Sequence, residues 1–393
     1  MSKPKLLVVA HTNLGSSLSG GDRIFLNLIK QWSTRFKITV LASPEAIKLI
    51  QNAHLHPSII QTTSLPTIAK LSTFNLFIHH FLRFVTGKIF CLKHRQLFKS
   101  ADYIYTSSDF YGDFVFGVMA KIFNQNIKWL CGYYLLAPFP TDRNSPYNTN
   151  HHFFRGLIYY FAQLPTVFLA NKFADKVFVT SAPDLTIFPG KSLIVQGGVY
   201  IPPISKIKLM TPSKNRPYDA FYLGRLHNQK GIIEMIDIWH LVTQVKPSAK
   251  LVIVGDGELM EPMIQKIEEL KLQKNIKIIG FLVGSKKYQI IRDSKIVIHP
   301  ATYDSGGMAA AEAMAWGLPG VSFDLPALKT YYPQGMIKTT PHNIPEFTDN
   351  IIRLLTDEKL YQQTSIAARQ LIVKCWGWEK RFADIYQALA IAK

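Results

Sequence analysis

Several features that often assign a function are missing from this 393-residue chain. The three cysteines, Cys91, Cys131 and Cys375, are odd in number and far apart, which argues against a disulfide framework or a zinc site and indicates a reducing compartment. No run of about 18 uncharged apolar residues occurs, so no transmembrane helix is expected. The N-terminus is basic and then apolar, but it lacks the apolar length and the cleavage site of a signal peptide. We therefore expect a cytoplasmic protein that begins with a β-strand.

Two ligand-binding motifs are also missing. The loop Gly15–Gly21 after the first strand lacks the Gly-x-Gly-x-x-Gly fingerprint, so binding of NAD is not predicted. No Asp-x-Asp motif occurs, and this lowers the support for metal-dependent sugar transfer. Asp256 and Glu258 come near to one, but Gly255–Gly257 is better explained as a turn in which Asp256 stabilises its own backbone. We expect no metal and no cofactor.

Acidic residues are scarce in the first half of the chain. Residues 1–217 hold 24 Lys or Arg and 8 Asp or Glu (24 − 8 = +16), whereas residues 218–393 hold 21 and 18 (21 − 18 = +3). No acid lies between Glu45 and Asp102. Such a charge attracts anionic partners. A membrane leaflet or an acidic glycan fits better than nucleic acid, because no nucleic-acid-binding motif accompanies the charge.

Strand-like and helix-like segments alternate along the whole chain, which predicts an α/β protein with parallel sheets covered on both faces. The proline- and lysine-rich stretch 201–217 is interpreted as a linker. We therefore predict two Rossmann-like domains, 1–205 and 215–377, with ligands bound between their strand ends. The buried strands are expected at 6–11, 37–42, 103–106, 128–131, 176–180 and 192–195, and then at 220–223, 250–254, 277–279, 296–299 and 319–323.

The most informative segment is Tyr303–Pro319. A carboxylate, Asp304, precedes the Gly306–Gly307 pair, which allows a ligand to approach the backbone closely. A helix then begins, and its free N–H groups point back at the loop. Glu312 lies about one turn inside it. Phosphate suits such a helix start, and a carboxylate can accept hydrogen bonds from sugar hydroxyls, so the segment indicates a phosphorylated sugar donor.

A second basic loop, Gly224–Gly231, directly follows a predicted strand. Its Arg225 and Lys230 are placed to neutralise a diphosphate without a metal. Taken alone, the loop is equally well explained as a solvated basic turn. Together with the segment around Asp304, a donor site is the better explanation.

These motifs together resemble the retaining, metal-independent glycosyltransferases of the GT-B fold, family 4. The family pattern is matched by Gly20–Gly21, by Gly224-Arg225 with Lys230-Gly231, by Gly255-Asp256-Gly257, and by Asp304 through Pro319. The Glu312–Pro319 match is the most specific. The resemblance covers nearly the whole chain and is weakest between residues 45 and 175. It also implies that the C-terminal helix, 378–393, packs back on the first domain, which would bind the acceptor.

The resemblance implies roles for individual residues. Arg225 and Lys230 would hold the donor diphosphate and stabilise the leaving group, and Glu312 would bind the nucleotide ribose. Gly21 would approach the diphosphate from the first domain. The other positions implied in donor binding are Gly20, Gly224, Gly257, Ser305, Gly306, Gly307 and Met308.

Two positions depart from the family pattern. The first carboxylate of the pair is Asp304, one methylene shorter than the usual Glu, and the change in reach affects sugar preference. No His follows the middle strand of the first domain, where Tyr133 or Tyr134 takes its place. A tyrosine can hydrogen-bond a sugar, but its high pKa makes it a poor base at neutral pH. The departing phosphate could supply the base instead, as proposed for retaining transfer.

The segment Phe74–Val85 predicts a helix with Phe74, Phe77, Ile78, Phe81 and Val85 on one face. A basic and aromatic amphipathic helix can lie in a membrane interface. A helix that faces the core with a solvated basic side is the alternative.

We predict an enzyme that transfers a sugar from a nucleotide-diphosphate donor to a glycan or lipid-linked acceptor. The rivals are a non-catalytic sugar-binding or scaffold protein of the same fold and a nucleotide-sugar epimerase.

Overall fold

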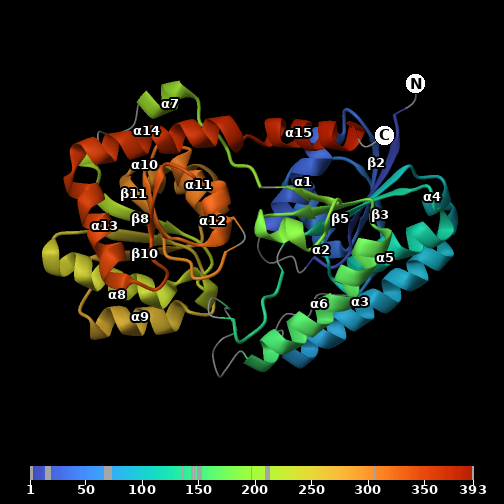
Figure 1. The fold of residues 1–393 in the computed structure, drawn as a ribbon, viewed down its shortest axis with the longest axis horizontal. Coiled ribbons are helices and arrows are strands. Elements are labelled where there is room, and N and C mark those ends of the chain that lie inside the picture. Colours follow the sequence, from blue (N-terminus) through green and yellow to red (C-terminus); the bar gives the residue numbers. More distant parts are fainter. Residues whose placement is uncertain are drawn as a thin grey trace. The chain divides into compact units, whose positions relative to one another are not determined.

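The computed structural model describes residues 3–13, 19–65, 73–134, 136–142, 145, 147, 153–195, 197–208, 213–304 and 306–391. The chain forms two compact units (Figure 1). Unit 1 is Met1–Gly197 with Trp378–Lys393, and unit 2 is Gly198–Gly377. The predicted division at 205 and 215 falls a little further along the chain than this one, and the return to unit 1 at Trp378 coincides with the predicted start of the C-terminal helix.

Unit 1 is built on a parallel seven-stranded sheet with the order β3-β2-β1-β4-β5-β6-β7. Its strands are β1 (Lys5–Ala10), β2 (Lys37–Ala42), β3 (Ser58–Gln61), β4 (Tyr103–Thr106), β5 (Lys128–Tyr133), β6 (Lys176–Val179) and β7 (Ser192–Ile194). Its helices are α1 (Gly20–Trp32), α2 (Pro44–Asn52), α3 (Thr73–Lys93), α4 (Arg95–Lys99), α5 (Tyr111–Phe123), α6 (Phe153–Phe173) and α15 (Trp378–Ile391).

The helices of unit 1 form a separate layer on each face of the sheet. Alternate β1 residues point to opposite faces. Leu6 and Val8 pack with α1, α2 and α15, whereas Leu7 and Val9 pack with α3, α5 and α6. The C-terminal helix α15 is held by a ring contact of Phe382 with Trp32, whose indole nitrogen donates to the Phe382 carbonyl at 3.3 Å. Helix α15 is therefore part of the core of unit 1.

Unit 2 is built on a parallel six-stranded sheet with the order β10-β9-β8-β11-β12-β13. Its strands are β8 (Tyr218–Leu223), β9 (Leu251–Val254), β10 (Ile276–Gly280), β11 (Ser294–His299), β12 (Gly320–Phe323) and β13 (Met336–Thr339). Its helices are α7 (Ile204–Lys208), α8 (Ile232–Val245), α9 (Met260–Glu269), α10 (Gly284–Arg292), α11 (Met308–Met314), α12 (Pro326–Tyr331), α13 (Ile344–Thr356) and α14 (Glu358–Cys375). Its 3₁₀ turns are Ser213–Asn215 and Asn228–Lys230.

The strand order of unit 2 reverses between β8 and β11. Successive strands run outward from β8 to β10, and the chain then returns to pair β11 with the other side of β8. In open parallel sheets, ligands bind outside the carboxyl ends of the strands at such a switch point. The loops after β8 and β11 therefore lie where a ligand site is expected.

The predicted strands correspond to strands in the structure with end shifts of one or two residues. Thr180 and Val195 lie just beyond β6 and β7, and His11 follows β1 rather than ending it. Strands β3 and β13 were not predicted. Both are four-residue edge strands, which lack the continuous apolar run of a strand buried on both faces.

The described parts of the stretch predicted as a linker, 201–208 and 213–217, belong to unit 2. Arg369 on α14 donates to the Pro202 carbonyl at 2.6 Å, and Val199 forms an isolated bridge with Gly377. Ile201 and Ile207 pack against the unit 2 core. Proline and lysine content alone did not reveal these contacts.

Candidate functional site

Three loops meet at the carboxyl edge of the unit 2 sheet. They follow the neighbouring strands β9, β8 and β11. The backbone of Leu226, in the loop after β8, donates to the Asp256 carbonyl at 3.0 Å, and Thr302 in the loop after β11 donates to the Gln229 carbonyl at 3.0 Å. The loops predicted from sequence to form one site are thus bonded to one another.

Glycines make this close approach of backbones possible. A Cβ at Gly255 would lie 1.9 Å from the Gly224 carbonyl oxygen, and one at Gly231 would lie 1.9 Å from that of Pro300. Gly231 also has φ +64°, a conformation that costs side-chain-bearing residues energy. The turn after β9 behaves as predicted, because Gly257 N–H donates to the Asp256 carboxylate at 2.8 Å.

Lys230 and Asp304 are brought together across the switch point. Lys230 Nζ lies 2.6 Å from Asp304 Oδ2. His299, at the end of β11, lies 3.0 Å from the same oxygen through Nε2. The other oxygen, Oδ1, accepts from the N–H groups of Gly306 at 3.0 Å and Gly307 at 2.9 Å. The carboxylate therefore has four donors, which fills the roughly four acceptor positions of a carboxylate.

These donors decide the charge state of Asp304. Burial by itself raises the pKa of a carboxyl group, but the Lys230 charge and the hydrogen bonds from His299 and Lys230 outweigh it. They hold the pKa of Asp304 well below its usual range. Asp304 is consequently an ionised acceptor at neutral pH and not a proton donor.

The second carboxylate, Glu312, is also engaged. It is buried on α11 and forms an ion pair with Lys287, a buried lysine on α10. A buried charge is costly unless it is paired, so Lys287 explains how Glu312 can remain ionised inside the unit. The glycine loop between Asp304 and Glu312 is held by Tyr332, whose hydroxyl donates to the Gly307 carbonyl at 2.6 Å.

The remaining residues predicted for the donor site vary in exposure. Arg225 is exposed on the loop after β8. Gly224 and Gly257 lie where the loops after β8 and β9 touch, since Gly224 contacts Gly255 and Gly257 contacts the Leu226 backbone. Met308 is partly buried against the unit 2 core at the start of α11. Ser305 lies outside the described residues.

The residues predicted in the first half of the chain form a second cluster, within unit 1. Gly20 and Gly21 open α1 behind the N-cap Ser19, which exchanges hydrogen bonds with Asp22. A Cβ at Gly21 would touch the Tyr134 ring at 3.4 Å. The structure thus places Gly21 beside Tyr134.

The two tyrosines considered at this position differ in surroundings. The Tyr133 side chain is fully buried in the core, with its hydroxyl 2.9 Å from Thr166 Oγ1. Tyr134 is half-buried and its hydroxyl lies 2.5 Å from that of Tyr105. Burial raises the pKa of Tyr134 above its ordinary value. Of the pair, Tyr134 is the one that lies beside the glycine loop.

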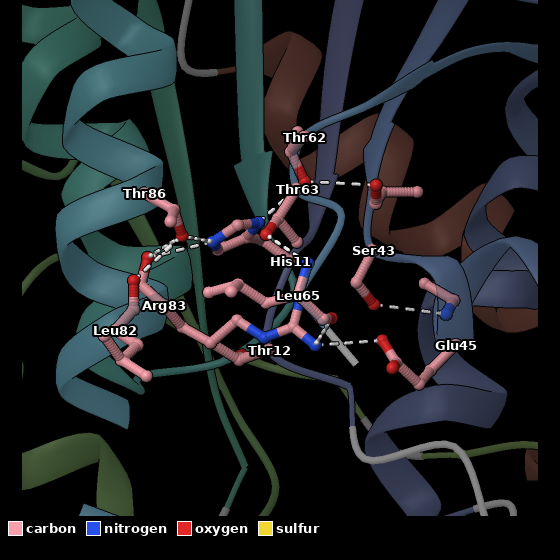
Figure 2. Close-up of polar contacts among 12 residues, drawn as sticks. His11, Thr12, Ser43, Glu45, Thr62, Thr63, Leu65, Leu82, Arg83 and Thr86 are labelled. Atoms are coloured by element: carbon pink, nitrogen blue, oxygen red, sulfur yellow. Dashed lines mark hydrogen bonds and ion pairs between the residues drawn. The ribbon is translucent and has the colours of Figure 1, made fainter. Parts of the chain in front are cut away.

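A buried polar cluster lies at the carboxyl ends of β1, β2 and β3 (Figure 2). His11 Nδ1 lies 2.6 Å from Thr62 Oγ1, and His11 Nε2 lies 2.9 Å from the Arg83 carbonyl oxygen. The fully buried Arg83 guanidinium pairs with Glu45 at 3.1 Å. Burial, with a smaller contribution from the positive charge of Arg83, lowers the pKa of His11 to about 4. His11 is therefore neutral near pH 7, and the cluster ties α3 to the loops after β1 and β3.

Sequence reasoning missed His299, Lys287 and the cluster around Arg83. His299 carried one usable signal, because it ends a predicted strand five residues before Asp304. Lys287 carried none, since it resembles the solvated lysines of any amphipathic helix. Among the described residues, no three His, Cys, Asp or Glu side chains gather as they would around a metal ion. No described helix has the length and apolar composition needed to cross a membrane.

Residues 205–371 match the family model described as "Glycosyl transferases group 1". This stretch lies within unit 2 and contains every predicted donor-site residue from Gly224 to Glu312. The curated relatives align over a stretch of similar length. The poly(ribitol-phosphate) alpha-N-acetylglucosaminyltransferase of Staphylococcus aureus is 26% identical over 165 residues, which is 40% of this chain and 32% of the relative. The amylovoran biosynthesis glycosyltransferase AmsD of Erwinia amylovora is 31% identical over 169 residues, 39% of this chain and 46% of the relative. The matched region thus spans less than half of each of these relatives.

Solved structures resemble the chain along its full length. The crystal structure of Anabaena HepE in complex with UDP-glucose has a TM-score of 0.70 and 20% identity, and it covers 98% of this chain and 99% of its own. These similarities confirm the predicted GT-B fold with two Rossmann-like sheets. The relatives are named glycosyltransferases, and the match to the glycosyltransferase family model lies in unit 2, in agreement with the prediction of an enzyme of this class.

Proposed function

We propose that this chain is a glycosyltransferase that moves a sugar from a nucleotide-diphosphate donor to a hydroxyl of a glycan or lipid-linked acceptor. The observation that carries the proposal is the Lys230–Asp304 contact of 2.6 Å at the switch point of unit 2. It fixes a cation at the edge of the sheet where ligands bind in this class of fold. The matched family domain and the named relatives support the same reaction class.

The donor diphosphate would be held by Lys230 and Arg225. A preorganised cation stabilises charge that develops on the leaving group, and two cations can do so without a metal ion. Glu312 would accept hydrogen bonds from the two hydroxyls of the ribose. The bound UDP-glucose of Anabaena HepE is the reason to place UDP-sugars first among candidate donors.

Asp304 would act mainly through its neighbours. All four acceptor positions are occupied by Lys230, His299 and the Gly306 and Gly307 amides. A sugar hydroxyl can bind the carboxylate only by displacing one of them. We therefore propose Asp304 as a positioning residue that fixes Lys230 and the glycine loop, with contact to the sugar as a secondary role.

Retention of the anomeric configuration is part of the proposal. The bond from the anomeric carbon to the phosphate oxygen would break, and the bond to the acceptor oxygen would form on the same face. The acceptor proton would pass to the departing phosphate oxygen. The environment of Tyr134 supports this route, because its raised pKa makes the hydroxyl a poor base.

The acceptor side would fall to unit 1. Its excess of basic residues favours an anionic glycan or a lipid-linked acceptor. The relative from Staphylococcus aureus is named for poly(ribitol-phosphate), an anionic polymer. We also propose a cytoplasmic location with peripheral attachment to the inner face of the membrane.

The test has two stages. Thermal unfolding with UDP-, GDP- and ADP-sugars identifies the donor, since a ligand at 100 times its Kd adds about 2.7 kcal/mol to the stability. Incubation with that donor and candidate acceptors then follows transfer, and NMR of the product gives its anomeric configuration. A product of opposite configuration disproves retention, and activity that is lost with EDTA and restored by a divalent ion disproves metal independence.

The rival functions give different outcomes. A scaffold binds the donor without consuming it, and an epimerase releases an epimerised sugar in the absence of an acceptor. Full transfer activity in both Lys230→Ala and Glu312→Ala would show that the proposed site is wrong.

A further inference from the structure

Helix α6 carries an exposed apolar stripe that the sequence did not point to. Phe154 is 77% exposed, Phe161 58% and Phe168 64%, and Ile158 is also exposed. At 100° per residue these four side chains and Pro165 fall within an arc of about 80°. Between Phe154 and Phe168 the stripe runs about 21 Å along the helix at 1.5 Å per residue. Gly156, Thr166 and Ala170 face the opposite way and are buried.

Helix α3 continues this apolar surface. Its residues Phe81, Ile89 and Leu92 are exposed. Both helices pack against α5 on one face of the unit 1 sheet (Figure 1). Tyr111 on α5 links them, because its ring contacts that of Phe84 and its hydroxyl donates to the Ala162 carbonyl at 2.5 Å. The exposed residues of α3 and α6 therefore belong to one side of unit 1.

The charged side chains of these two helices are all basic. Neither Thr73–Lys93 nor Phe153–Phe173 contains an Asp or Glu. The exposed cations beside the apolar residues are Lys88, Lys93 and Lys172. The opposite helix layer differs in both respects. Its helices α1, α2 and α15 hold acidic residues, and none of their described side chains is among the large exposed apolar ones.

We infer that α6, together with α3, forms a surface that lies in the headgroup region of an anionic membrane. Exposed phenylalanines between lysines match the two components of such an interface, an apolar layer and a negative surface potential. An anionic polymer would be bound by the lysines but would leave the Phe stripe in water. A second copy of the chain would place the like charges of the two copies against each other. The lipid surface is the occupant that uses both features.

The structure also corrects part of the sequence-based interpretation of α3. The predicted face contained Phe74, Phe77, Ile78, Phe81 and Val85, and the side chains of Phe74 and Phe77 lie outside the described part of the chain. Ile78 and Val85 are half-buried and only Phe81 is well exposed. Helix α6 thus contributes the longer apolar stripe.

Vesicle sedimentation of the full chain tests the inference without any sugar, so its result is independent of the proposed transfer reaction. We expect at least tenfold more binding to vesicles with 30% phosphatidylglycerol than to phosphatidylcholine vesicles at low salt. The variant Phe161→Ser/Phe168→Ser should lose tenfold or more of this binding. Ile366→Ser is the matched control, because Ile366 is 59% exposed on α14 of unit 2, and it should bind like the wild type.

A second variant, Lys88→Glu/Lys93→Glu, keeps the Phe stripe and reverses the charge. It should bind anionic vesicles at least fivefold more weakly and keep the thermal unfolding midpoint of the wild type. Equal binding by all the variants overturns the inference. Self-association without lipid that disappears in Phe161→Ser/Phe168→Ser would also overturn it, by assigning the face to a second copy of the chain.

Discussion

Lys230 Nζ lies 2.6 Å from Asp304 Oδ2, although 74 positions separate these residues in the chain. The lysine follows β8 and the aspartate follows β11, the two strands between which the sheet order reverses. The contact leaves the lysine partly exposed and the carboxylate almost fully buried. The aspartate therefore fixes a lysine whose charged end can still meet a ligand.

Replacement of Lys230 should remove transfer activity. A single preorganised donor for a leaving group or oxyanion contributes about 100- to 1,000-fold to kcat. The kcat of Lys230→Ala is therefore expected to be at least about 100-fold lower than that of the wild type. Steady-state kinetics with the donor found by thermal unfolding measures it.

Lys266 offers a matched control for this change. Lys266 Nζ also lies 2.6 Å from a carboxylate, that of Asp237, but it links α9 to α8 away from the three loops. Lys266→Ala should keep the wild-type kcat. An equal loss in both variants would mean that the effect is structural and not specific to the site.

Variants of the Lys287–Glu312 pair should distinguish an effect on stability from an effect on donor binding. Lys287→Gln leaves a buried carboxylate without its cation, which costs roughly 3–5 kcal/mol in comparable buried pairs. The double variant Lys287→Met/Glu312→Gln removes both charges, so most of the stability should return. Donor affinity should stay low, because the amide of Glu312→Gln offers the ribose hydroxyls one neutral acceptor oxygen where the carboxylate offers two charged ones.

Urea unfolding and donor titration of the wild type and these two variants measure the two effects. If the double variant recovers donor affinity along with stability, Glu312 does not contact the donor.

The pH dependence of stability should depend in part on His11. Because burial lowers its pKa from 6.5 to about 4, the unfolded chain takes up a proton between these pH values that the folded chain does not. The free energy of unfolding should therefore rise as the pH increases from 4 to 6.5 and then level off. At about 1.4 kcal/mol per pKa unit, the contribution of His11 has an upper limit of roughly 3.5 kcal/mol.

Urea unfolding at pH 4.5, 5.5 and 7 tests this prediction. His11→Gln should show a shallower rise than the wild type, and some rise should remain because burial also lowers the pKa of His80 to about 4. His56→Gln, at an exposed position, should keep the wild-type slope. An unchanged slope in His11→Gln would contradict the assignment of a low pKa.

The loops after β8 and β9 approach so closely at Gly255 that this position should not accept a side chain. Gly255→Ala would place a Cβ 1.9 Å from the Gly224 carbonyl oxygen, and overpacking of this kind costs about 1–3 kcal/mol. The shift should move the loop that carries Arg225 and weaken donor binding. Gly377→Ala, whose nearest contact is Ile201 at 3.5 Å, should be close to neutral in thermal unfolding. Equal stability of the two variants would contradict the steric argument.

One edge strand of each sheet shows where local sequence patterns fail. The buried central strands were predicted because they are continuous apolar runs, which few other environments produce. Strands β3 and β13 are short and partly polar, so only their pairing partner identifies them. In the same way, Tyr133 and Tyr134 are adjacent in sequence, but they pack into cores on opposite faces of the sheet. The sequence did not indicate which of them lies beside Gly21.

By itself, the sequence determined the α/β class, the glycine loops, the basic first half and the candidate residues Arg225, Lys230, Asp304 and Glu312. These are properties of composition and of short motifs, and they survive in any arrangement of the elements. Only the tertiary structure decided what those residues contact. It brought His299 and Lys230 to Asp304 and Lys287 to Glu312, and it exposed the Phe stripe of α6. Packing decides such contacts because it joins elements that lie far apart in the chain. It also decides whether the apolar face of a helix is buried, which the sequence of the helix alone does not show.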